Sequence, residues 1–241
     1  MSSSLIFSSP GFCDICERTV EFRAKYDWFR DHLLCSRCGS VPRERALMQV
    51  IKRYYPKYRK MRIHESSPGD RGVSPRLQRE CRKYSFSHFF PDVSPGETHP
   101  KLKMRCENLE SLTFPDSSFD LFITQDVAEH IMDPAAAFRE IARVLRPGGA
   151  HIFTVPLVRK GEATRRRAEL AGDGKIVHLL EPEFHGSPTD ENGSLVTMDW
   201  GYDIVKFIAE VAGMPGHIVH IDDLYHGIRA EFIEVVVSLK R

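Results

Sequence analysis

Four of the six cysteines in this 241-residue chain form two closely spaced pairs near its N-terminus. They are Cys13-Asp-Ile-Cys16 and Cys35-Ser-Arg-Cys38, with residues 17–34 between them. Each turn can direct two thiolates at one tetrahedral ion, and this spacing is typical of zinc sites. Four thiolates leave no open coordination position, so the sequence predicts a structural zinc ion. Disulfides or unliganded thiols are the alternative.

The residues between the two pairs are expected to form a hairpin that brings the pairs together, with Phe22, Trp28 and Phe29 as its small core. The other two cysteines, Cys81 and Cys106, stand alone and are interpreted as ordinary small apolar residues.

A second group of polar residues follows the apolar run 119–124, which has the character of a parallel strand covered on both faces. This group is the segment Gln125-Asp-Val-Ala-Glu-His130. Ligands of open parallel sheets bind beyond the carboxyl ends of the strands. The segment is therefore placed to face a ligand.

The residues after this segment predict the helix and strand that must position it. Asp133 is a good N-cap, and Pro134 suits the first helical position. Pro147-Gly-Gly149 is expected to end the helix before a strand over 150–155. The apolar stripe that would face the sheet consists of Phe138, Ile141, Ala142 and Leu145.

The rest of the chain alternates between strand and helix patterns, which predicts a doubly wound, mostly parallel α/β sheet. Helices are expected over 42–55, 75–84 and 202–212, and strands over 61–65, 84–90, 217–222 and 232–239. The basic residues of the first helix, among them Arg43 and Arg45, are interpreted as a solvated face rather than a nucleic-acid patch. Arg165-Arg-Arg167 is interpreted as an exposed helical face, with attraction of an anionic substrate as the alternative.

Composition limits the function classes. A net charge of +1 argues against a dominant nucleic-acid footprint. No apolar run approaches the roughly 20 residues of a membrane span. The N-terminal Met-Ser-Ser-Ser-Leu-Ile-Phe lacks the basic leader and apolar core of a signal peptide, so a cytoplasmic location is expected.

The stretch 112–156 closely resembles the C-terminal half of class I S-adenosylmethionine-dependent methyltransferase domains of type 11. Together with the paired cysteines and the segment Cys38-Gly-Ser-Val-Pro-Arg-Glu-Arg-Ala46, it resembles a subgroup with an N-terminal zinc module and a glycine-poor first motif. The resemblance implies a Rossmann-like, seven-stranded sheet with an antiparallel edge strand. It also implies a zinc module within 1–40 and a methyltransferase domain over 41–241, with 157–200 as a variable substrate-side insertion.

The resemblance also implies where the cofactor S-adenosylmethionine would lie. The glycine-rich turn that usually follows the first strand is replaced by Glu65-Ser-Ser-Pro-Gly69. A carboxylate such as Glu65 suits the cofactor's ammonium group, and serine hydroxyls suit its carboxylate. The ribose acid at the end of the second strand is replaced by Ser87. The predicted cofactor residues are Glu65, Ser66, Ser67, Ser87, Glu107, Asn108, Leu109, Gln125, Asp126 and Val127.

Methyl transfer needs alignment of the nucleophile, and it needs a general base only when the nucleophile carries a proton. His130 is the first candidate base, and His185 and His178 are the next, with surface or hydrogen-bonding histidines as the alternative. The leading hypothesis is a methyltransferase for a small-molecule or glycan acceptor. The alternatives are a non-catalytic zinc-module binding protein with a degenerate methyltransferase fold, and a nucleic-acid or protein methyltransferase.

Overall fold

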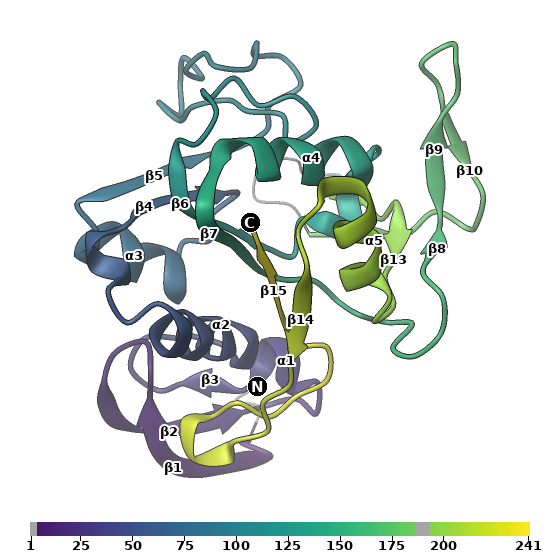
Figure 1. Cartoon of the computed structure of the whole chain (residues 1–241). Coiled ribbons are helices and arrows are strands. Elements are labelled where there is room, and N and C mark those ends of the chain that lie inside the picture. Colours follow the sequence, from purple (N-terminus) through teal and green to yellow (C-terminus); the bar gives the residue numbers. More distant parts are fainter. Residues whose placement is uncertain (1–3, 187–192) are drawn as a thin grey trace.

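A six-stranded sheet forms the centre of the computed structural model, which describes residues 4–186 and 193–241 (Figure 1). The strands run in the order β14-β15-β7-β6-β4-β5. Their bounds are β4 Arg62–Ser66, β5 Lys83–Ser87, β6 Phe119–Gln125, β7 Leu145–Thr154, β14 Gly216–Val219 and β15 Val235–Leu239. Four of them, β5, β4, β6 and β7, are parallel neighbours, as the alternating pattern predicts.

The chain winds outward from the middle of this sheet in both directions. It passes from β4 to β5 on one side and then returns to β6 on the other side of β4. Open α/β sheets bind ligands at such a reversal of strand order, beyond the carboxyl ends of the strands, which are here β4 and β6. The fold therefore brings the segments after residues 66 and 125 to one edge.

Two features of the sheet differ from expectation. The described residues give six strands rather than seven, because the strand that would flank β5 is reduced to a single parallel bridge between His88 and Cys106. Two backbone hydrogen bonds hold this bridge, from His88 N to the Arg105 carbonyl and from Glu107 N to the His88 carbonyl. The antiparallel strand, β15, lies second from the edge rather than at it.

Helices cover both faces of the sheet (Figure 1). On one face lie α4, Pro134–Val144, and α5, Ile204–Ala212, over a core that includes Phe138 and Trp200. The Asp133 side chain caps α4 by accepting from Ala136 N at 2.9 Å, which confirms the predicted N-cap. The helix ends at Val144, and β7 begins at once, so Pro147-Gly-Gly149 lies within the strand rather than at the helix end.

On the other face lie α2, Pro42–Tyr54, and α3, Val73–Glu80. Beyond α2 is a small antiparallel sheet of β1, Phe7–Cys13, β2, Arg18–Ala24, and β3, Leu34–Cys35, with α1, Phe29–His32, at its side. One hydrophobic cluster joins both sheets, since Phe22 and Ile63 belong to it. The division of the chain into domains at residue 40 stays a prediction.

Arg45 on α2 corrects the expected solvated face of that helix. Its side chain is completely buried. The guanidinium donates to the carbonyls of Ser40, Leu33 and Gly227, with the last two at 2.8 and 2.7 Å. Periodicity alone places a charged residue on the solvent side, but here the small sheet covers it. Trp28 is the reverse case, because it is 43% exposed where a core residue was expected.

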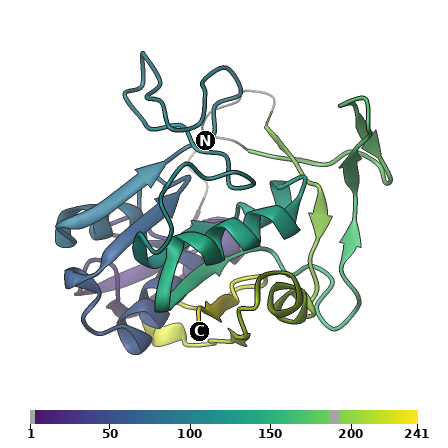
Figure 2. The same ribbon diagram turned by 45° about the horizontal axis from the view of Figure 1, so that its top comes forward.

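The described residues between β7 and α5 form short strands and turns that extend to one side of the sheet (Figure 2). The strands are β8 Arg165–Arg166, β9 Ala168–Leu170, β10 Ile176–His178, β11 Phe184–His185, β12 Ser194–Leu195 and β13 Met198–Asp199. Arg165 and Arg167 both pair with Asp199, so this basic run is not an exposed helical face. Short 3-10 turns lie at Tyr58–Lys60, Ala128–His130 and Leu224–His226. Among the residues described, no helix has the length and apolar character that crossing a membrane requires.

Candidate functional site

The turns after β4 and β6 both contain a residue in a left-handed backbone conformation. Ser67 has a φ of 56° and Asp126 a φ of 52°. Residues other than glycine rarely adopt this conformation, and it costs on the order of 1–3 kcal/mol where it is enforced. Both positions lie at the reversal of strand order. Five other described residues that are not glycine also have a positive φ, so this edge is the candidate site because ligands of open α/β sheets bind at such a reversal.

Glu65, at the end of β4, organises the edge. Its buried carboxylate accepts hydrogen bonds from Ser74 Oγ, Tyr84 Oη and Gln125 Nε2, each at 2.7 Å. Burial raises the pKa of this carboxyl, although its three donors act in the opposite direction. The bond to Gln125 ties the ends of β4 and β6 together, so two predicted cofactor residues are in direct contact.

The predicted serines are held in different ways. Ser66 is buried, and Ser67 donates its backbone N–H to the Ser87 carbonyl at 2.8 Å. This bond joins the turns after β4 and β5. The Ser87 hydroxyl lies 3.0 Å from Nε2 of His64, inside the sheet face rather than at the edge. A role for Ser87 in holding ribose stays a prediction.

Glu107 and its neighbours follow the single-bridge strand. The Glu107 carboxylate is buried and accepts from Arg105 Nε at 2.7 Å and from Thr113 Oγ1 at 2.6 Å. The Asn108 side chain accepts from Glu110 N at 2.9 Å, and Leu109 is buried. These contacts rigidify the segment that would hold the adenine amino group.

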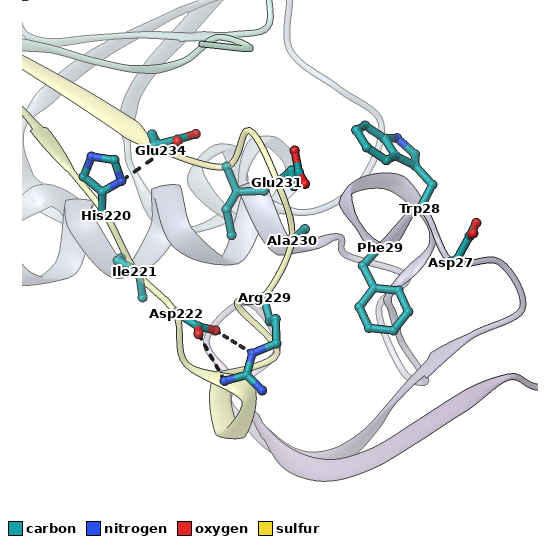
Figure 3. Close-up of a pocket in the computed structure, with 11 residues that line it drawn as sticks. Asp27, Trp28, Phe29, His220, Ile221, Asp222, Arg229, Ala230, Glu231 and Glu234 are labelled. Carbon is teal, nitrogen blue, oxygen red and sulfur yellow. Dashed lines mark hydrogen bonds and ion pairs between the residues drawn. The ribbon is translucent and has the colours of Figure 1, made fainter. Parts of the chain in front are cut away.

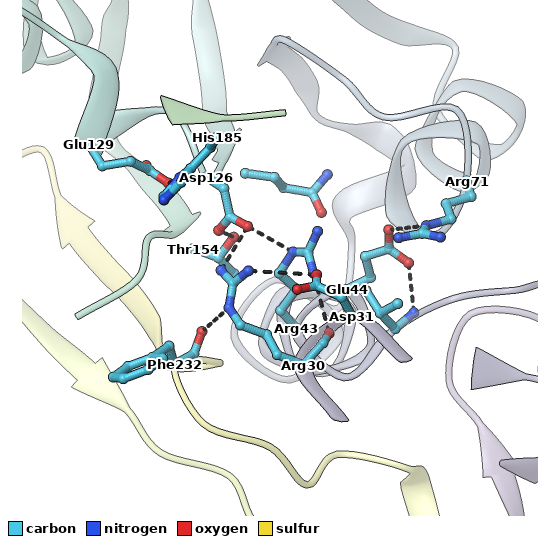
Figure 4. A network of polar contacts seen from close by, with 12 residues as sticks. Arg30, Asp31, Arg43, Glu44, Arg71, Asp126, Glu129, Thr154, His185 and Phe232 are labelled. Atoms are coloured by element: carbon cyan, nitrogen blue, oxygen red, sulfur yellow. Dashed lines mark hydrogen bonds and ion pairs between the residues drawn. The ribbon is translucent and has the colours of Figure 1, made fainter. Parts of the chain in front are cut away.

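Asp126 faces the cysteine module rather than open solvent (Figure 4). Its carboxylate lies 2.8 Å from Arg30 of α1 and 2.8 Å from Arg43 of α2, and it accepts from Thr154 Oγ1 at 3.0 Å. Burial by itself would raise the pKa of the Asp126 carboxyl, but the two guanidinium groups outweigh it and hold the pKa low. Val127, partly buried, packs against the core beneath α4. Sequence analysis did not identify the two arginines, because nothing local links them to residue 126.

His130 and His185, which are 55 positions apart in sequence, are neighbours in the structure, with ring centroids 5.2 Å apart and perpendicular planes. Between them lies Glu129, whose Oε1 is 3.8 Å from His130 Nε2 and 3.8 Å from His185 Nδ1. Figure 4 shows Glu129 and His185 beside Asp126, at the same edge of the sheet. Glu129 was not predicted as a site residue, although it immediately precedes His130 in the sequence.

The four paired cysteines converge at one point. Their sulfur atoms all lie within 4.8 Å of one another, with Cys13 Sγ 3.7 Å from Cys38 Sγ and Cys16 Sγ 3.9 Å from Cys35 Sγ. Sulfurs bound at 2.3 Å to a tetrahedral zinc ion are about 3.8 Å apart. The donor set and the spacing therefore fit zinc.

A cavity of about 730 Å³ lies elsewhere, between the loop before α1 and the loops that flank β14 and β15 (Figure 3). Trp28, His220, Asp222, Arg229 and Glu234 are among its lining residues. None of the predicted cofactor or catalytic residues lines it. This cavity is therefore separate from the candidate site at the ends of β4 and β6.

Comparison with known sequences identifies one part of the chain. Residues 85–153 match the family model described as "Methyltransferase domain". A probable S-adenosylmethionine-dependent methyltransferase of Mycolicibacterium smegmatis is 40% identical over 58 residues, which are 24% of this chain and 23% of that protein. The sarcosine/dimethylglycine N-methyltransferase of Halorhodospira halochloris is 29% identical over 136 residues, 52% of this chain and 45% of that protein. The chain thus spans less than half the length of these relatives.

Comparison with solved structures identifies the fold. An S-adenosylmethionine-dependent methyltransferase from Mesorhizobium loti aligns with a TM-score of 0.50 at 17% identity, covering 81% of this chain and 98% of that one. A complex of the Haloferax volcanii Trm112 methyltransferase activator with a methyltransferase aligns with a TM-score of 0.52 at 16% identity, covering 82% and 90%. The chain has the Rossmann-like α/β fold of methyltransferases, with a mixed central sheet.

Proposed function

We propose that the protein is an S-adenosylmethionine-dependent methyltransferase acting on a small-molecule or glycan acceptor, with a structural zinc ion in its N-terminal module. The main support for this proposal is the position of the segment that matches the methyltransferase domain. The segment that matches the methyltransferase domain, 85–153, contains β6 and the turn after it. That turn meets the end of β4 at the strand-order reversal, where a cofactor of this fold would bind.

The cofactor would lie across the turns after β4, β5 and β6. Ser66 and Ser67 would meet its amino-acid end, with the carboxyl of Glu65 behind them. The segment Glu107-Asn-Leu109 would flank the adenine, and Ser87 would be nearest the ribose. Gln125, Asp126 and Val127 would form the opposite wall. The internal bonds of Glu65 and Glu107 preorganise this surface, so less ordering is needed when the cofactor binds.

The methyl group of the cofactor is activated by its bond to a sulfonium sulfur. In the reaction, an acceptor atom forms a bond to the methyl carbon while the carbon–sulfur bond breaks, and the bonding pair stays on sulfur. Alignment alone can contribute about 7–11 kcal/mol to such a step. A hydroxyl acceptor must lose its proton during this reaction. His130 and His185 lie beside the turn after β6 and are the candidate bases that would accept this proton.

The acceptor class rests on the relatives and on charge. Three of the similar proteins are named for small acceptors: two are dimethylglycine N-methyltransferases, one of them also acting on sarcosine, and the third is a ubiquinone biosynthesis O-methyltransferase. The near-neutral net charge of +1 is unlike that of proteins that bind nucleic acid through a basic surface. An enzyme with a small-molecule or glycan acceptor fits both observations.

A specific observation favours a second candidate, a non-catalytic binding protein with the same fold. The carboxylates of Glu65 and Glu107 are both buried and already accept hydrogen bonds from neighbouring side chains. If these bonds do not rearrange, the cofactor finds few free partners. Cofactor binding therefore separates the two candidates.

Titration calorimetry of the zinc-loaded protein with S-adenosylmethionine and S-adenosylhomocysteine is the direct test. We expect a dissociation constant on the order of 1 μM for each, a binding free energy of about 8 kcal/mol. A screen of amine, hydroxyl and glycan acceptors would then identify the substrate by product mass. If neither cofactor form binds at millimolar concentration, the binding-protein candidate replaces the enzyme.

A further inference from the structure

We propose that Glu129, His130 and His185 form a second metal site, which takes a divalent transition ion of the zinc class and keeps a coordination position open. The site is separate from the four cysteines in both position and chemistry. Its three ligand atoms, one carboxylate oxygen and two imidazole nitrogens, all lie within 4.8 Å of one another. They come from the turn after β6 and from β11, which the fold alone brings together.

The distances fit an ion with a small adjustment. Glu129 Oε1 is 3.8 Å from each histidine nitrogen, His130 Nε2 and His185 Nδ1. Ligands bound at 2.0–2.1 Å to a tetrahedral zinc ion are about 3.4 Å apart. Each histidine nitrogen would move closer to the Glu129 oxygen by about 0.4 Å when an ion binds. The nearly perpendicular imidazole rings can both direct a lone pair toward one point.

The state of the Glu129 carboxylate is the second observation. Glu129 is 2% exposed, and neither of its carboxylate oxygens has a hydrogen-bond partner among the residues that the structure describes. A buried carboxylate without donors is costly, and buried charges are ordinarily paired or bound to metal. Glu65 and Glu107, at the same edge, are both fully hydrogen-bonded. A cation between Glu129 and the two histidines would supply the missing partner.

The surroundings of the three residues match those of metal ligands. His130 Nδ1 lies 2.9 Å from the Leu195 carbonyl, so this nitrogen carries the proton and leaves Nε2 with a free lone pair. His185 Nε2 lies 3.5 Å from a carboxylate oxygen of Glu183. Outer contacts of this kind orient metal-bound histidines and raise their basicity. The Glu129 backbone is fixed as well, because its carbonyl accepts from Thr197 N at 2.7 Å and Thr197 Oγ1 at 3.0 Å.

The donor set selects the class of ion. Two imidazoles and one carboxylate suit zinc, iron(II), cobalt or nickel, whereas magnesium and calcium prefer oxygen ligands. Three protein ligands leave a position for water or substrate, unlike the closed set of four thiolates. The His185 side chain is 38% exposed and the His130 side chain 16%, so the open position would face solvent. If the proposed methyltransferase function holds, an acceptor oxygen would bind the ion there, and the ion would take the place of a free histidine base in promoting loss of the acceptor's proton.

Cobalt(II) titration of the full-length, zinc-loaded protein tests the site. We expect about one equivalent of cobalt to bind with weak visible absorption and without thiolate charge-transfer bands, since those bands would report exchange at the cysteines. Glu129→Gln, His130→Ala and His185→Ala should each weaken binding by about 100-fold or more, since loss of an outer-shell partner alone costs 10- to 100-fold. His178→Ala, on exposed β10, is the matched control and should bind cobalt normally.

Two results would overturn the proposal. One is that the zinc-loaded protein binds no cobalt except with thiolate bands. The other is that the three ligand variants bind the single equivalent of cobalt as well as the control does, because Glu129 and the histidines would then form only an ion pair. Zinc content at the cysteines, measured in every variant, shows that each has folded. Calorimetry of the His185→Ala variant with S-adenosylmethionine measures cofactor binding independently of cobalt binding. A failure of the methyltransferase proposal can therefore be distinguished from a failure of the metal-site proposal.

Discussion

Arg30 of the cysteine module lies 2.8 Å from Asp126, in the turn after β6. Arg30 Nε also donates to the Phe232 carbonyl at 3.0 Å, before β15. A single side chain thus joins the N-terminal module, the predicted cofactor wall and the C-terminal segment. The module is therefore positioned to hold this turn in place.

Replacing this arginine should affect both stability and cofactor binding. In Arg30→Ala, the Asp126 carboxylate keeps Arg43 and Thr154 but loses one charged partner. We expect the free energy of unfolding to fall by about 1–3 kcal/mol, and S-adenosylmethionine to bind more weakly because the turn is less fixed. Urea unfolding and calorimetry measure the two effects. Arg229→Ala removes an exposed pair with Asp222 and should leave stability almost unchanged. Equal effects of the two variants would contradict the prediction.

Arg45 should be the most sensitive basic residue of α2. Its replacement by methionine would fill similar volume but leave the carbonyls of Leu33 and Gly227 without their donor. We expect a loss of about 3–5 kcal/mol in the free energy of unfolding, since buried polar groups would lose their partners. Arg53→Met, at an exposed position of the same helix, should be nearly neutral. A similar small effect of both replacements in urea unfolding would show that the buried guanidinium contributes little.

Removing zinc should unfold the N-terminal module and weaken the cofactor site with it. Chelation would leave four thiols close together around a small core, and structural zinc contributes directly to folding. We expect one zinc per chain at the cysteines, a lower melting temperature after chelation, and recovery when zinc is restored. Cys81→Ala and Cys106→Ala should retain the ion, because these cysteines are isolated and buried elsewhere. An unchanged melting curve after verified zinc loss would contradict a structural role.

Glu65 should matter for cofactor binding more than the donors around it. Glu65→Gln removes the negative charge and cannot accept from all three neighbours. A charge-assisted hydrogen bond contributes about 1.5–3 kcal/mol, so S-adenosylmethionine should bind roughly 10- to 100-fold more weakly. Tyr84→Phe removes one donor to the same carboxylate and should leave affinity within about twofold. If the two variants bind the cofactor alike, Glu65 serves the fold and not the ligand.

Two buried histidines should make the fold sensitive to acid. Burial lowers the pKa of His64 to about 3, with a smaller contribution from Arg105, and burial lowers the pKa of His151 to about 3 as well. The unfolded chain, with histidine pKa values near 6.5, therefore binds more protons between pH 3 and 6.5. Stability from these groups is complete above pH 6.5 and falls as the pH decreases, by about 1.4 kcal/mol per pH unit for each histidine. Glu65 has the opposite effect on stability. Because the pKa of its carboxyl is raised in the folded protein, its contribution to stability falls as the pH rises above the ordinary pKa of glutamate.

The variant His151→Gln isolates one of these contributions. Glutamine can keep the contact with Thr124, which lies 3.0 Å from His151 Nε2, and it does not titrate. Urea unfolding between pH 5 and 8 should therefore show a shallower loss of stability toward pH 5 in the variant than in the original protein. Identical slopes would mean that the buried His151 does not stay neutral in the folded state.

Much of the fold could be predicted from the sequence because its signals are local. The apolar run 119–124, the Asp133 cap and the helical pattern over 202–212 each act within a few turns of the chain, and the structure confirms the elements that they indicate. The spacing of the two cysteine pairs likewise predicted that they would converge. The local patterns indicate six strands, and the described residues form a six-stranded sheet. The seventh strand was implied only by the family resemblance, and a single bridge at Cys106 stands in its place.

The candidate site shows what the sequence alone determined and what required the tertiary structure. The sequence placed polar residues after β4 and β6, because the end of a strand is a local property. It did not reveal that Arg45 is buried, that Arg30 reaches Asp126, or that Glu129 lies between His130 and His185. Each of these depends on groups distant in the chain, and a charged side chain is stable in the interior only when folding supplies its partner. Local pattern fixes where an element begins and ends, whereas the packing of elements decides which charges meet.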